Sequence, residues 1–478
     1  MKTWLMYING EWMDTEEKIE VVNPATLEVV ATVPKAGAKE AKKAVDAASE
    51  ALPAWKAKTA AERGALLMNW FRLIDEQKEE IGRIMTTEQG KPLAEAIGEV
   101  GYANSFISWY AEEGKRIYGE TIPASAPNKR IFVLKQPVGV VAAITPWNFP
   151  AAMMTRKAAP ALAAGCTIVV KPAELTPLTA YKLIELAEEA GIPKGVINVI
   201  TGDAAAIGET WMADSRIRKI SFTGSTKIGK LLMKQAADTM KKVSLELGGH
   251  APFIVTENAD LDKAVAGIIA SKYRNAGQTC VCANRVFVHE SVEEEFVGLL
   301  KTAVSELKVG NGLTDGVQIG PLINQAAVDK VRNQLDEAVE KGAHLELGGE
   351  EFSSEKGYFI TPAVLTNVSD DMACMNEETF GPLAPVTTFK TIGEVIERAN
   401  NSPYGLAAYV FSENISEAIT ISEGLEYGIV GLNDGLPSVA QAPFGGMKES
   451  GLGREGGHFG MEEFLEVKYM IRESLYFK

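Results

Sequence analysis

The sequence predicts an α/β protein with two domains, each built on a largely parallel sheet. Three observations lead to this fold class. The chain has 478 residues, which is more than one ordinary domain holds. From about Arg130 to residue 249, runs rich in Val and Ile alternate with helical patterns, and a second alternation starts near Ala251. Strand and helix alternating at this spacing is typical of βαβ units in a parallel sheet.

The N-terminal part precedes the first alternation. MKTWLMYINGEW predicts a strand, a turn at Asn9-Gly10 and a second strand, and it lacks the apolar core and cleavage site of a signal peptide. Helical patterning then runs from about Ala38 to Trp55, from Ala61 to Gln89 and from Lys91 to Tyr118.

The first alternation carries glycines where its strands pass into helices. Doubly wound sheets bind ligands beyond the carboxyl ends of their strands, so these positions predict a ligand site. The segments expected are strands in RIFVLKQPVGVVAAITPW, CTIVVKP, Val196–Thr201, KISFTG and VSLELGG, with helices at Ala158–Gly165, Thr179–Gly191, from Ala204 and from Ser225.

The second alternation includes PFIV, a helix over Leu261–Arg274, RVFVH, helices over Val292–Leu307 and Gln325–Lys341, and four later strands. The C-terminal KYMIRESLYF is strand-like and lies beyond both domains. A terminal strand with no partner in its own domain often pairs with a neighbouring subunit, and we expect that of this strand.

Charge and composition exclude several function classes. With 48 Lys and Arg against 63 Asp and Glu, the formal charge is −15, which repels phosphate backbones and anionic membrane surfaces. We therefore expect no nucleic-acid partner and no membrane partner. The most apolar region is interrupted by prolines and by Arg156-Lys157, so no membrane span is predicted. Four cysteines in so long a chain are not a disulfide framework, and we expect a cytoplasmic protein.

A glycine loop, FTGSTKIGK, nearly matches the phosphate-binding pattern G-x-x-x-x-G-K-S/T. Its last position is Leu231, so the hydroxyl that binds Mg²⁺ is missing, and a P-loop ATPase stays only a distant alternative. The physically better interpretation is a turn at Gly224 that feeds a helix opening at Ser225, whose N-terminus can receive a pyrophosphate. A turn selected only for packing stays open as an alternative.

Lys171 and Glu174 directly follow the strand CTIVV. At a strand end, a lysine and a glutamate three residues apart can reach the two hydroxyls of a ribose, and the carboxylate disfavours a 2′-phosphate. The alternative is a solvated salt pair on a loop.

GQTCVCANR contains Cys280 and Cys282, and Cys280 is a candidate nucleophile on a loop. An inert structural cysteine is the alternative. The C-x-C spacing and the four histidines show no zinc-ligand pattern, so no metal site is expected. Asn148, held in PWNFP between two prolines, suits an oxyanion donor. Glu246, beside two glycines at the end of an apolar strand, suits a general base with a raised pKa.

PWNFP, KPAE, FTGST, ELGG, GQTC, NEETFGP and PFGGMKESGLGREG occur in this order, and together they resemble the NAD(P)-dependent aldehyde dehydrogenase superfamily. The likeness covers essentially the whole chain. It implies a Rossmann-type coenzyme domain without G-x-G-x-x-G (residues 1–118 and 139–249), an α/β catalytic domain (250–450) and a small β oligomerisation element (119–138 and 460–478). It also implies a homodimer or homotetramer that uses NAD, with NADP as a second option.

The resemblance also implies roles for single residues. Cys280 is the nucleophile, Glu246 the general base, and Asn148 shares the oxyanion hole with the backbone N–H of Cys280. Lys157 supports this centre. The coenzyme-binding residues implied are Trp147, Lys171, Glu174, Gly224, Ser225, Glu378 and Phe380. A non-catalytic protein of the same fold is disfavoured because Cys280, Glu246 and Asn148 occur together.

The C-x-C motif and MTRK are similar to those of succinate-semialdehyde dehydrogenases, whose aldehyde substrate carries a carboxylate. Arg156, Arg274 and Ser438 are the residues expected to anchor that carboxylate. Glutarate semialdehyde, one methylene longer, could use the same anchor. Because a C-x-C disulfide closes a small, strained ring, we expect Cys282 to cap Cys280 reversibly under oxidation. The alternative for Cys282 is a small buried residue.

Overall fold

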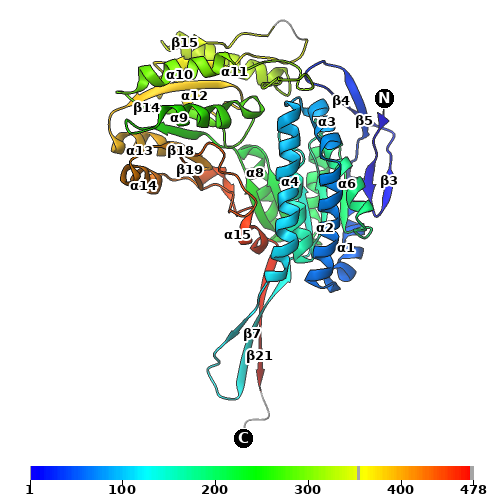
Figure 1. Ribbon diagram of the computed structural model, residues 1–478. Helices are drawn as coiled ribbons and strands as arrows, with labels where there is room; N and C mark the ends of the chain where they lie inside the picture. The colour runs from blue at the N-terminus through cyan, green and yellow to red at the C-terminus, as the bar shows by residue number, and fades with distance from the viewer. Residues whose placement is uncertain (1, 353–355, 474–478) are drawn as a thin grey trace.

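Two large sheets organise the structure, a computed structural model that describes residues 2–352 and 356–473 (Figure 1). The first sheet has the strand order β20-β12-β11-β8-β9-β10-β2-β3, and the second has the order β15-β16-β17-β14-β13-β18-β19. Each sheet has its own cluster of buried apolar side chains. The predicted α/β class with two domains is confirmed.

The centre of the first sheet consists of five parallel strands that are buried on both faces. Buried parallel strands favour continuous apolar runs, as VVAAI and TIVV illustrate. The strands are β8 (Val140–Ile144), β9 (Thr167–Lys171), β10 (Ile197–Val199), β11 (Ile217–Thr223) and β12 (Lys242–Glu246). Between them run α5 (Ala152–Ala164), α6 (Leu178–Glu189), α7 (Ala204–Ala213) and α8 (Thr226–Ala236).

The strand order of this sheet reverses between β8 and β11. The chain moves outward from β8 through β9 to β10 and then returns to β11 on the other side of β8. Right-handed crossovers therefore place α5 and α6 on one face of the sheet and α7 and α8 on the other. The loops that follow β8 and β11 diverge at this point, which is where doubly wound sheets hold their ligands.

The N-terminal segment extends and covers this sheet. β2 (Met6–Ile8) and β3 (Glu11–Met13) form the predicted hairpin, with φ of 55° at Asn9 and 78° at Gly10. The predicted helix Ala61–Gln89 is interrupted at Gln77 (φ −111°, ψ 16°) and is therefore two helices. The remaining elements are β1 (Lys2–Thr3), β4 (Lys18–Val22), β5 (Val29–Pro34), α1 (Ala38–Ala57), α2 (Ala60–Glu76), α3 (Lys78–Gln89) and α4 (Leu93–Glu113).

The second sheet is parallel except for its edge strand β15. The predicted helix Leu261–Arg274 is shorter: α9 ends at Ile268 and passes into a π turn over Ile269–Tyr273, a rare conformation that often marks functional sites. The strands are β13 (Ala251–Val255), β14 (Ala283–His289), β15 (His344–Leu347), β16 (Ala363–Thr366), β17 (Leu383–Phe389), β18 (Ala407–Phe411) and β19 (Ile429–Leu432). The helices after α9 are α10 (Glu293–Ser305), α11 (Gln325–Glu340), α12 (Ala373–Asn376), α13 (Ile392–Asn400) and α14 (Ile415–Gly424).

Besides a small sheet of order β1-β5-β4 in the N-terminal segment, another three-stranded sheet projects from the body as a long ribbon (Figure 1). It contains β6 (Glu120–Ile122), β7 (Lys129–Pro137) and β21 (Leu465–Glu473). β21 pairs antiparallel with β7 from Leu465 opposite Pro137 to Glu473 opposite Lys129, so the C-terminal strand has a partner outside both domains in its own chain, and its pairing with a neighbouring subunit stays a prediction. One edge of β21 carries no strand within the described residues. Residue 1 and residues 474–478 of the predicted domain ranges lie outside the described residues.

The segment before β21 returns to the first domain. β20 (Gly451–Leu452) pairs with β12, although it lies just past the predicted catalytic range 250–450, and α15 (Gly457–Glu462) follows it. Across residues 2–352 and 356–473, no helix combines the length and the apolar character that a membrane crossing requires.

Candidate active site

The first sheet brings four sequence motifs to one edge. β8 ends three residues before Trp147, β9 ends at Lys171, β11 ends just before Gly224, and β12 ends at Glu246. Because these strands are parallel, their carboxyl ends share one edge of the sheet. PWNFP, KPAE, FTGST and ELGG therefore lie side by side.

The second sheet meets this edge through the amino ends of its strands. Cys280 lies three residues before β14, and Phe380 lies three residues before β17. The loops touch through backbone atoms: a Cβ at Gly249 would lie 2.2 Å from the carbonyl oxygen of Cys280. A Cβ at Gly277, where φ is +75°, would lie 2.2 Å from the carbonyl oxygen of Gly381. Glycine is thus required where ELGG, GQTC and ETFGP approach one another.

Cys280 lies where two cavities meet. One has a volume of about 310 Å³ and is lined in part by Glu95, Glu99 and Tyr102 of α4; we call it the α4 cavity. The other, of about 370 Å³, is lined by Gly224 and Ser225 at the start of α8; we call it the α8 cavity. Cys280 belongs to both walls, so a group attached to its sulfur can be reached from either side.

The thiol of Cys280 is partly open to the cavities but deep among protein atoms. Burial raises its pKa to about 12, and the carboxyl groups of Glu246 and Glu378 add to that shift, while Arg156 and Arg274 oppose it. In the unliganded enzyme the Cys280 side chain is therefore a thiol at neutral pH, and the nucleophilic thiolate has to form during the reaction.

Asn148 is buried beside Cys280 in the wall of the α8 cavity. Its Nδ2 donates a hydrogen bond to the carbonyl oxygen of Gln278 (3.1 Å). A side-chain amide has two N–H donors, so one of them is left for a developing oxyanion.

Glu246 belongs to a buried charge network that includes a residue which sequence reasoning missed, Glu455. Lys157 forms an ion pair with Glu455 and donates to Thr223 Oγ1 (2.7 Å), and Arg156 Nε lies 2.9 Å from Glu455 Oε2. Burial works against ionisation of Glu455, but these two cations lower its pKa. Burial and the charge of Glu455 raise the pKa of Glu246 well above its ordinary value. Glu246 thus has the raised pKa expected of a base that works near neutral pH.

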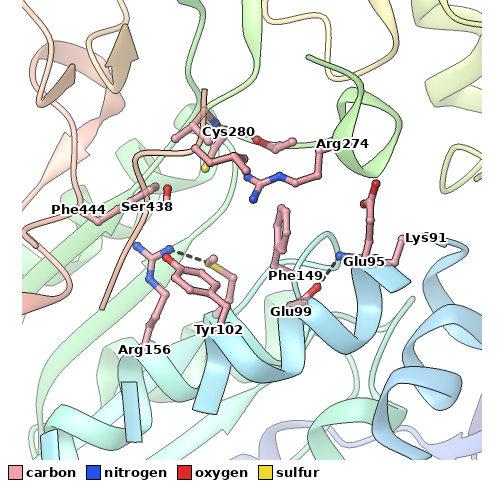
Figure 2. A pocket seen from close by; sticks show the side chains of 15 residues that line it. Lys91, Glu95, Glu99, Tyr102, Phe149, Arg156, Arg274, Cys280, Ser438 and Phe444 are labelled. Atoms are coloured by element: carbon pink, nitrogen blue, oxygen red, sulfur yellow. Dashed lines mark hydrogen bonds and ion pairs between the residues drawn. The ribbon is translucent and has the colours of Figure 1, made fainter. Parts of the chain in front are cut away.

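The α4 cavity gathers the three predicted anchors, Arg156, Arg274 and Ser438, on one side of Cys280 (Figure 2). Arg156 is already paired with Glu455, and its guanidinium carbon lies 4.0 Å from the ring centroid of Phe444. Its Nη2 is buried and has no hydrogen-bond partner in the described part of the chain, and the same holds for Arg274 Nε. Tyr102, which was not predicted, adds a third unpartnered group, its hydroxyl.

The α8 cavity holds most of the predicted coenzyme residues. The rings of Trp147 and Phe380 meet edge to face with centroids 5.6 Å apart, and Phe380 has a left-handed φ of 55°. Glu378 Oε1 accepts from the N–H of Gly249 (3.0 Å), and burial raises the pKa of Glu378 to about 7. Ser225 caps α8 by accepting from the N–H of Ile228 (3.4 Å).

Lys171 and Glu174 lie outside the wall of this cavity. They form an ion pair with each other at the end of β9, with Lys171 buried and Glu174 35% exposed in its side chain. Glu174 is therefore the more exposed member of the pair, and neither residue lines the cavity wall that includes Cys280.

Cys282 is fully buried and lines neither cavity. Its sulfur contacts Lys272 Nζ at 3.4 Å, and the same Nζ donates to Asn284 Oδ1 (2.9 Å). Both Cys280 and Cys282 are free thiols in the structure. Burial raises the pKa of Cys282, and Lys272 partly opposes the shift.

Sequence reasoning missed the polar residues that α4 contributes to this cavity and Lys91, which lies two residues before the helix begins. Glu95, Glu99 and Tyr102 have i, i+4 and i+7 spacing, so they share one face of α4, and Lys91 precedes them by four residues. Polar side chains at helical spacing in an otherwise apolar helix were the available signal. Within the described ranges, no group of three or more His, Cys, Asp or Glu side chains is placed to hold a metal ion.

Comparison with known proteins agrees with this arrangement. Residues 12–470 match the aldehyde dehydrogenase family. The chain is 56% identical to the glutarate-semialdehyde dehydrogenase of Pseudomonas putida, over 97% of this chain and 96% of that protein. It is also 56% identical to the NADP(+) succinate-semialdehyde dehydrogenase of Escherichia coli, with the same coverage. The ATPase alternative finds no support in these matches.

Solved structures give the same result. A succinate-semialdehyde dehydrogenase from Burkholderia pseudomallei superposes with a TM-score of 0.97 at 54% identity, covering 98% of both chains. A betaine aldehyde dehydrogenase from Staphylococcus aureus, solved with NAD⁺, superposes with a TM-score of 0.96 at 36% identity, covering 99% of this chain and 95% of that one. With its motifs gathered around Cys280 and these relatives matching along its length, the chain belongs to the aldehyde dehydrogenase family.

Proposed function

We propose that the enzyme oxidises a small aldehyde bearing a distal carboxylate, with succinate semialdehyde as the first candidate and glutarate semialdehyde as the second. The observation that carries this proposal is the set of buried donors in the α4 cavity: Arg156 Nη2, Arg274 Nε and the Tyr102 hydroxyl have no hydrogen-bond partner in the described part of the chain. Unpaired buried donors are costly, so they favour an anionic ligand. A relative of each substrate type matches the chain at 56% identity.

Arg274 is the strongest of these anchors. Unlike Arg156, it has no ion pair among the described residues, and its guanidinium carbon lies 5.3 Å from the ring centroid of Phe149. In a protein of charge −15, an unpaired guanidinium provides the local attraction that an anionic substrate needs. Cys280 lies in the wall of the same cavity, so a short chain with a carboxylate at one end and an aldehyde at the other fits between them.

The chemistry then follows from groups already described. The Cys280 thiolate adds to the aldehyde carbon, and Asn148 together with the N–H of Cys280 stabilises the oxyanion that forms. The residues around the α8 cavity, among them Trp147, Glu378 and Phe380, would hold NAD(P), which when bound would accept the hydride, and loss of that hydride would leave a thioester on Cys280. Glu246 takes a proton from water, which attacks the thioester, releases the acid and restores the thiolate. Aldehyde, NAD(P)⁺ and water thus give carboxylate, NAD(P)H and two protons.

The enzyme uses NAD(P), and we propose a preference for NAD. Glu174 lies three residues after β9 with a partly exposed carboxylate, and a negative charge there disfavours a 2′-phosphate. Lys171 neutralises part of that charge through its ion pair, so we expect about a tenfold preference rather than exclusion of NADP.

We also propose a homodimer or homotetramer in the cytoplasm. The free edge of β21 and its exposed Val467, Tyr469 and Ile471 offer a strand-pairing surface to a second copy. A compartment that keeps thiols reduced suits a catalytic cysteine.

Kinetics with a set of aldehydes and both coenzymes test the proposal. We expect kcat/KM for succinate semialdehyde to fall about 100-fold in Arg274→Ala, because one partner of a buried charged contact is removed. For hexanal, which has no carboxylate, we expect less than about a threefold change. Arg216→Ala, which removes an exposed arginine paired with Asp214 and Asp46, is the matched control and leaves both rates unchanged. Equal losses on both aldehydes would reject the anchor, and a higher kcat/KM with NADP would reject the coenzyme preference.

A further inference from the structure

A buried ion pair joins Lys91, two residues before α4 begins, to Glu99 within α4, beside the turn that carries Asn148. The side chains of Lys91 and Glu99 are 1% and 2% exposed and form an ion pair with each other. Buried ion pairs cost desolvation energy and persist only when their remaining donors and acceptors are also satisfied. The remaining contacts of this pair are therefore informative.

Lys91 and Glu99 both make their remaining polar contacts to one short turn. Glu99 Oε1 accepts from the backbone N–H of Ala151 (3.0 Å) and Ala152 (3.3 Å) at the start of α5. Lys91 Nζ donates to the carbonyl oxygen of Asn148 (2.8 Å) and lies 4.0 Å from the ring centroid of Phe149. The ion pair thus holds both ends of the turn Asn148–Ala152.

A second set of hydrogen bonds connects the same turn to the loop that carries Cys280. Gln89 Oε1 accepts from the backbone N–H of Lys91 (2.9 Å), and Gln89 Nε2 donates to Asn275 Oδ1 (2.9 Å). Asn275 Nδ2 in turn donates to the carbonyl oxygens of Asn148 (3.1 Å) and Gln278 (3.2 Å). The Asn148 carbonyl therefore receives one donor from each domain, and Gln278 lies two residues before Cys280.

We infer that Lys91 and Glu99 are positioning residues that aim the side-chain amide of Asn148 at the oxygen of the aldehyde. We call the pair the Asn148 clamp. It rests on the proposed role of Asn148 as the oxyanion donor. A displacement of about 1 Å in a catalytic group can cost about 100-fold in rate, so a rigid support for this turn has kinetic value. Neither residue forms a hydrogen bond or an ion pair with Cys280 in the described chain, although both line the α4 cavity, so their connection to the oxyanion runs through Asn148.

A second buried carboxylate offers a matched control for simple structural support. Glu88 accepts from the backbone N–H of Leu178 (2.6 Å) and Thr179 (2.9 Å) at the start of α6, as Glu99 does at the start of α5. Glu88 lines neither cavity. A substitution there tests helix capping without the connection to Asn148.

The test compares Glu99→Gln and Lys91→Met with Glu88→Gln. We expect the first two to lower kcat about 10- to 100-fold while KM changes less than about threefold, because the oxyanion is stabilised mainly in the transition state. Glu88→Gln should lower Tm by a similar amount and leave kcat unchanged. If all three variants lose kcat in proportion to Tm, the clamp is rejected. Lys91→Met answers the question if Glu99→Gln does not fold.

A double-mutant cycle with Asn148→Ala separates the clamp from the role of Asn148. If the clamp acts through Asn148, adding Glu99→Gln to Asn148→Ala lowers kcat less than about twofold further. A full additional loss of 10- to 100-fold would reject the clamp and leave the role of Asn148 intact. Near-normal kcat in Asn148→Ala alone would overturn the oxyanion assignment, and the clamp with it.

Discussion

The two sheets contribute to the active site through opposite edges. The first sheet presents the carboxyl ends of its parallel strands, from which Trp147, Gly224 and Glu246 follow. The second sheet presents the amino ends, where Cys280 precedes β14 and Glu378 precedes β17. At the carboxyl edge, a strand runs into a helix whose N-terminus attracts anions, as α8 does beside the α8 cavity. At the edge formed by the amino ends of the second sheet, which we call the amino edge, the strands begin and do not lead into helices in this way.

The amino edge instead depends on local backbone conformation. The residues before Cys280 follow a π turn and then adopt left-handed φ values of 52° at Asn275, 54° at Ala276 and 75° at Gly277. Left-handed backbone at a residue other than glycine costs about 1 kcal/mol or more, and it persists only where contacts enforce it. Coenzyme binding in this fold therefore follows from topology, whereas the nucleophile is held by strain and by contacts across the domain interface.

Removing the nucleophile has the largest expected effect, and it tests whether the two sheet edges work independently. We expect Cys280→Ala to lower aldehyde-dependent reduction of NAD(P) at least about 10⁴-fold, because the covalent route is lost. Coenzyme binding, measured by protein fluorescence or calorimetry, should change less than about threefold, since the carboxyl edge is intact. A large loss of coenzyme affinity would show that the two edges are not independent.

The same contrast explains what the sequence could and could not predict. Strand–helix alternation places Trp147, Lys171, Gly224 and Glu246 at one sheet edge, because parallel strands all end there. No comparable rule places the loop of Cys280, and its role came from a resemblance of motifs. The π turn in the predicted helix Leu261–Arg274 was missed because Ile, Ala and Lys favour an ordinary α-helix as well.

Long-range ion pairs were beyond reach for a different reason. Glu455 meets Lys157 across 298 positions of sequence, and no local pattern encodes such a partner. Arg156 was predicted as an anchor for the substrate carboxylate, and the structure also pairs it with Glu455. Tyr102, Glu99 and Lys91 were overlooked because a helix face with a few polar residues is usually a solvated face.

A substitution at Glu246 should have the second-largest effect, at the carboxyl edge. We expect Glu246→Gln to lower steady-state kcat about 10²- to 10³-fold, because the variant loses the proposed general base for the water. In the proposed order of steps Glu246 acts only after hydride transfer, so a burst of about one NAD(P)H per subunit should precede the slow phase in stopped-flow measurements. A loss of the burst would place Glu246 before the thioester and contradict the proposed order of steps.

The raised pKa of Glu246 also predicts the sign of a pH effect on stability. In the folded protein Glu246 keeps its proton to a higher pH than in the unfolded chain, where the proton leaves near the ordinary pKa of a glutamate. The unfolding free energy of the parent enzyme therefore falls as pH rises above that ordinary value, and Glu246→Gln removes this loss. Tm should rise in the variant at pH 8 by more than it does at pH 5, in thermal unfolding scans of both proteins. An equal change at both pH values would contradict the raised pKa.

Cys282 should have the smallest effect on turnover, and it tests whether the amino edge also carries a redox switch. Its thiol contacts Lys272, so an oxidised switch requires that contact to break. Peroxide converts the Cys280 thiolate to a sulfenic acid, and attack by Cys282 then gives a disulfide and water. We expect kcat of Cys282→Ala to stay within about twofold of the parent. After peroxide, dithiothreitol should restore most of the parent's activity but less than about half of the variant's, because an uncapped sulfenic acid oxidises further. Equal recovery in the two proteins would leave Cys282 as a packing residue held by Lys272.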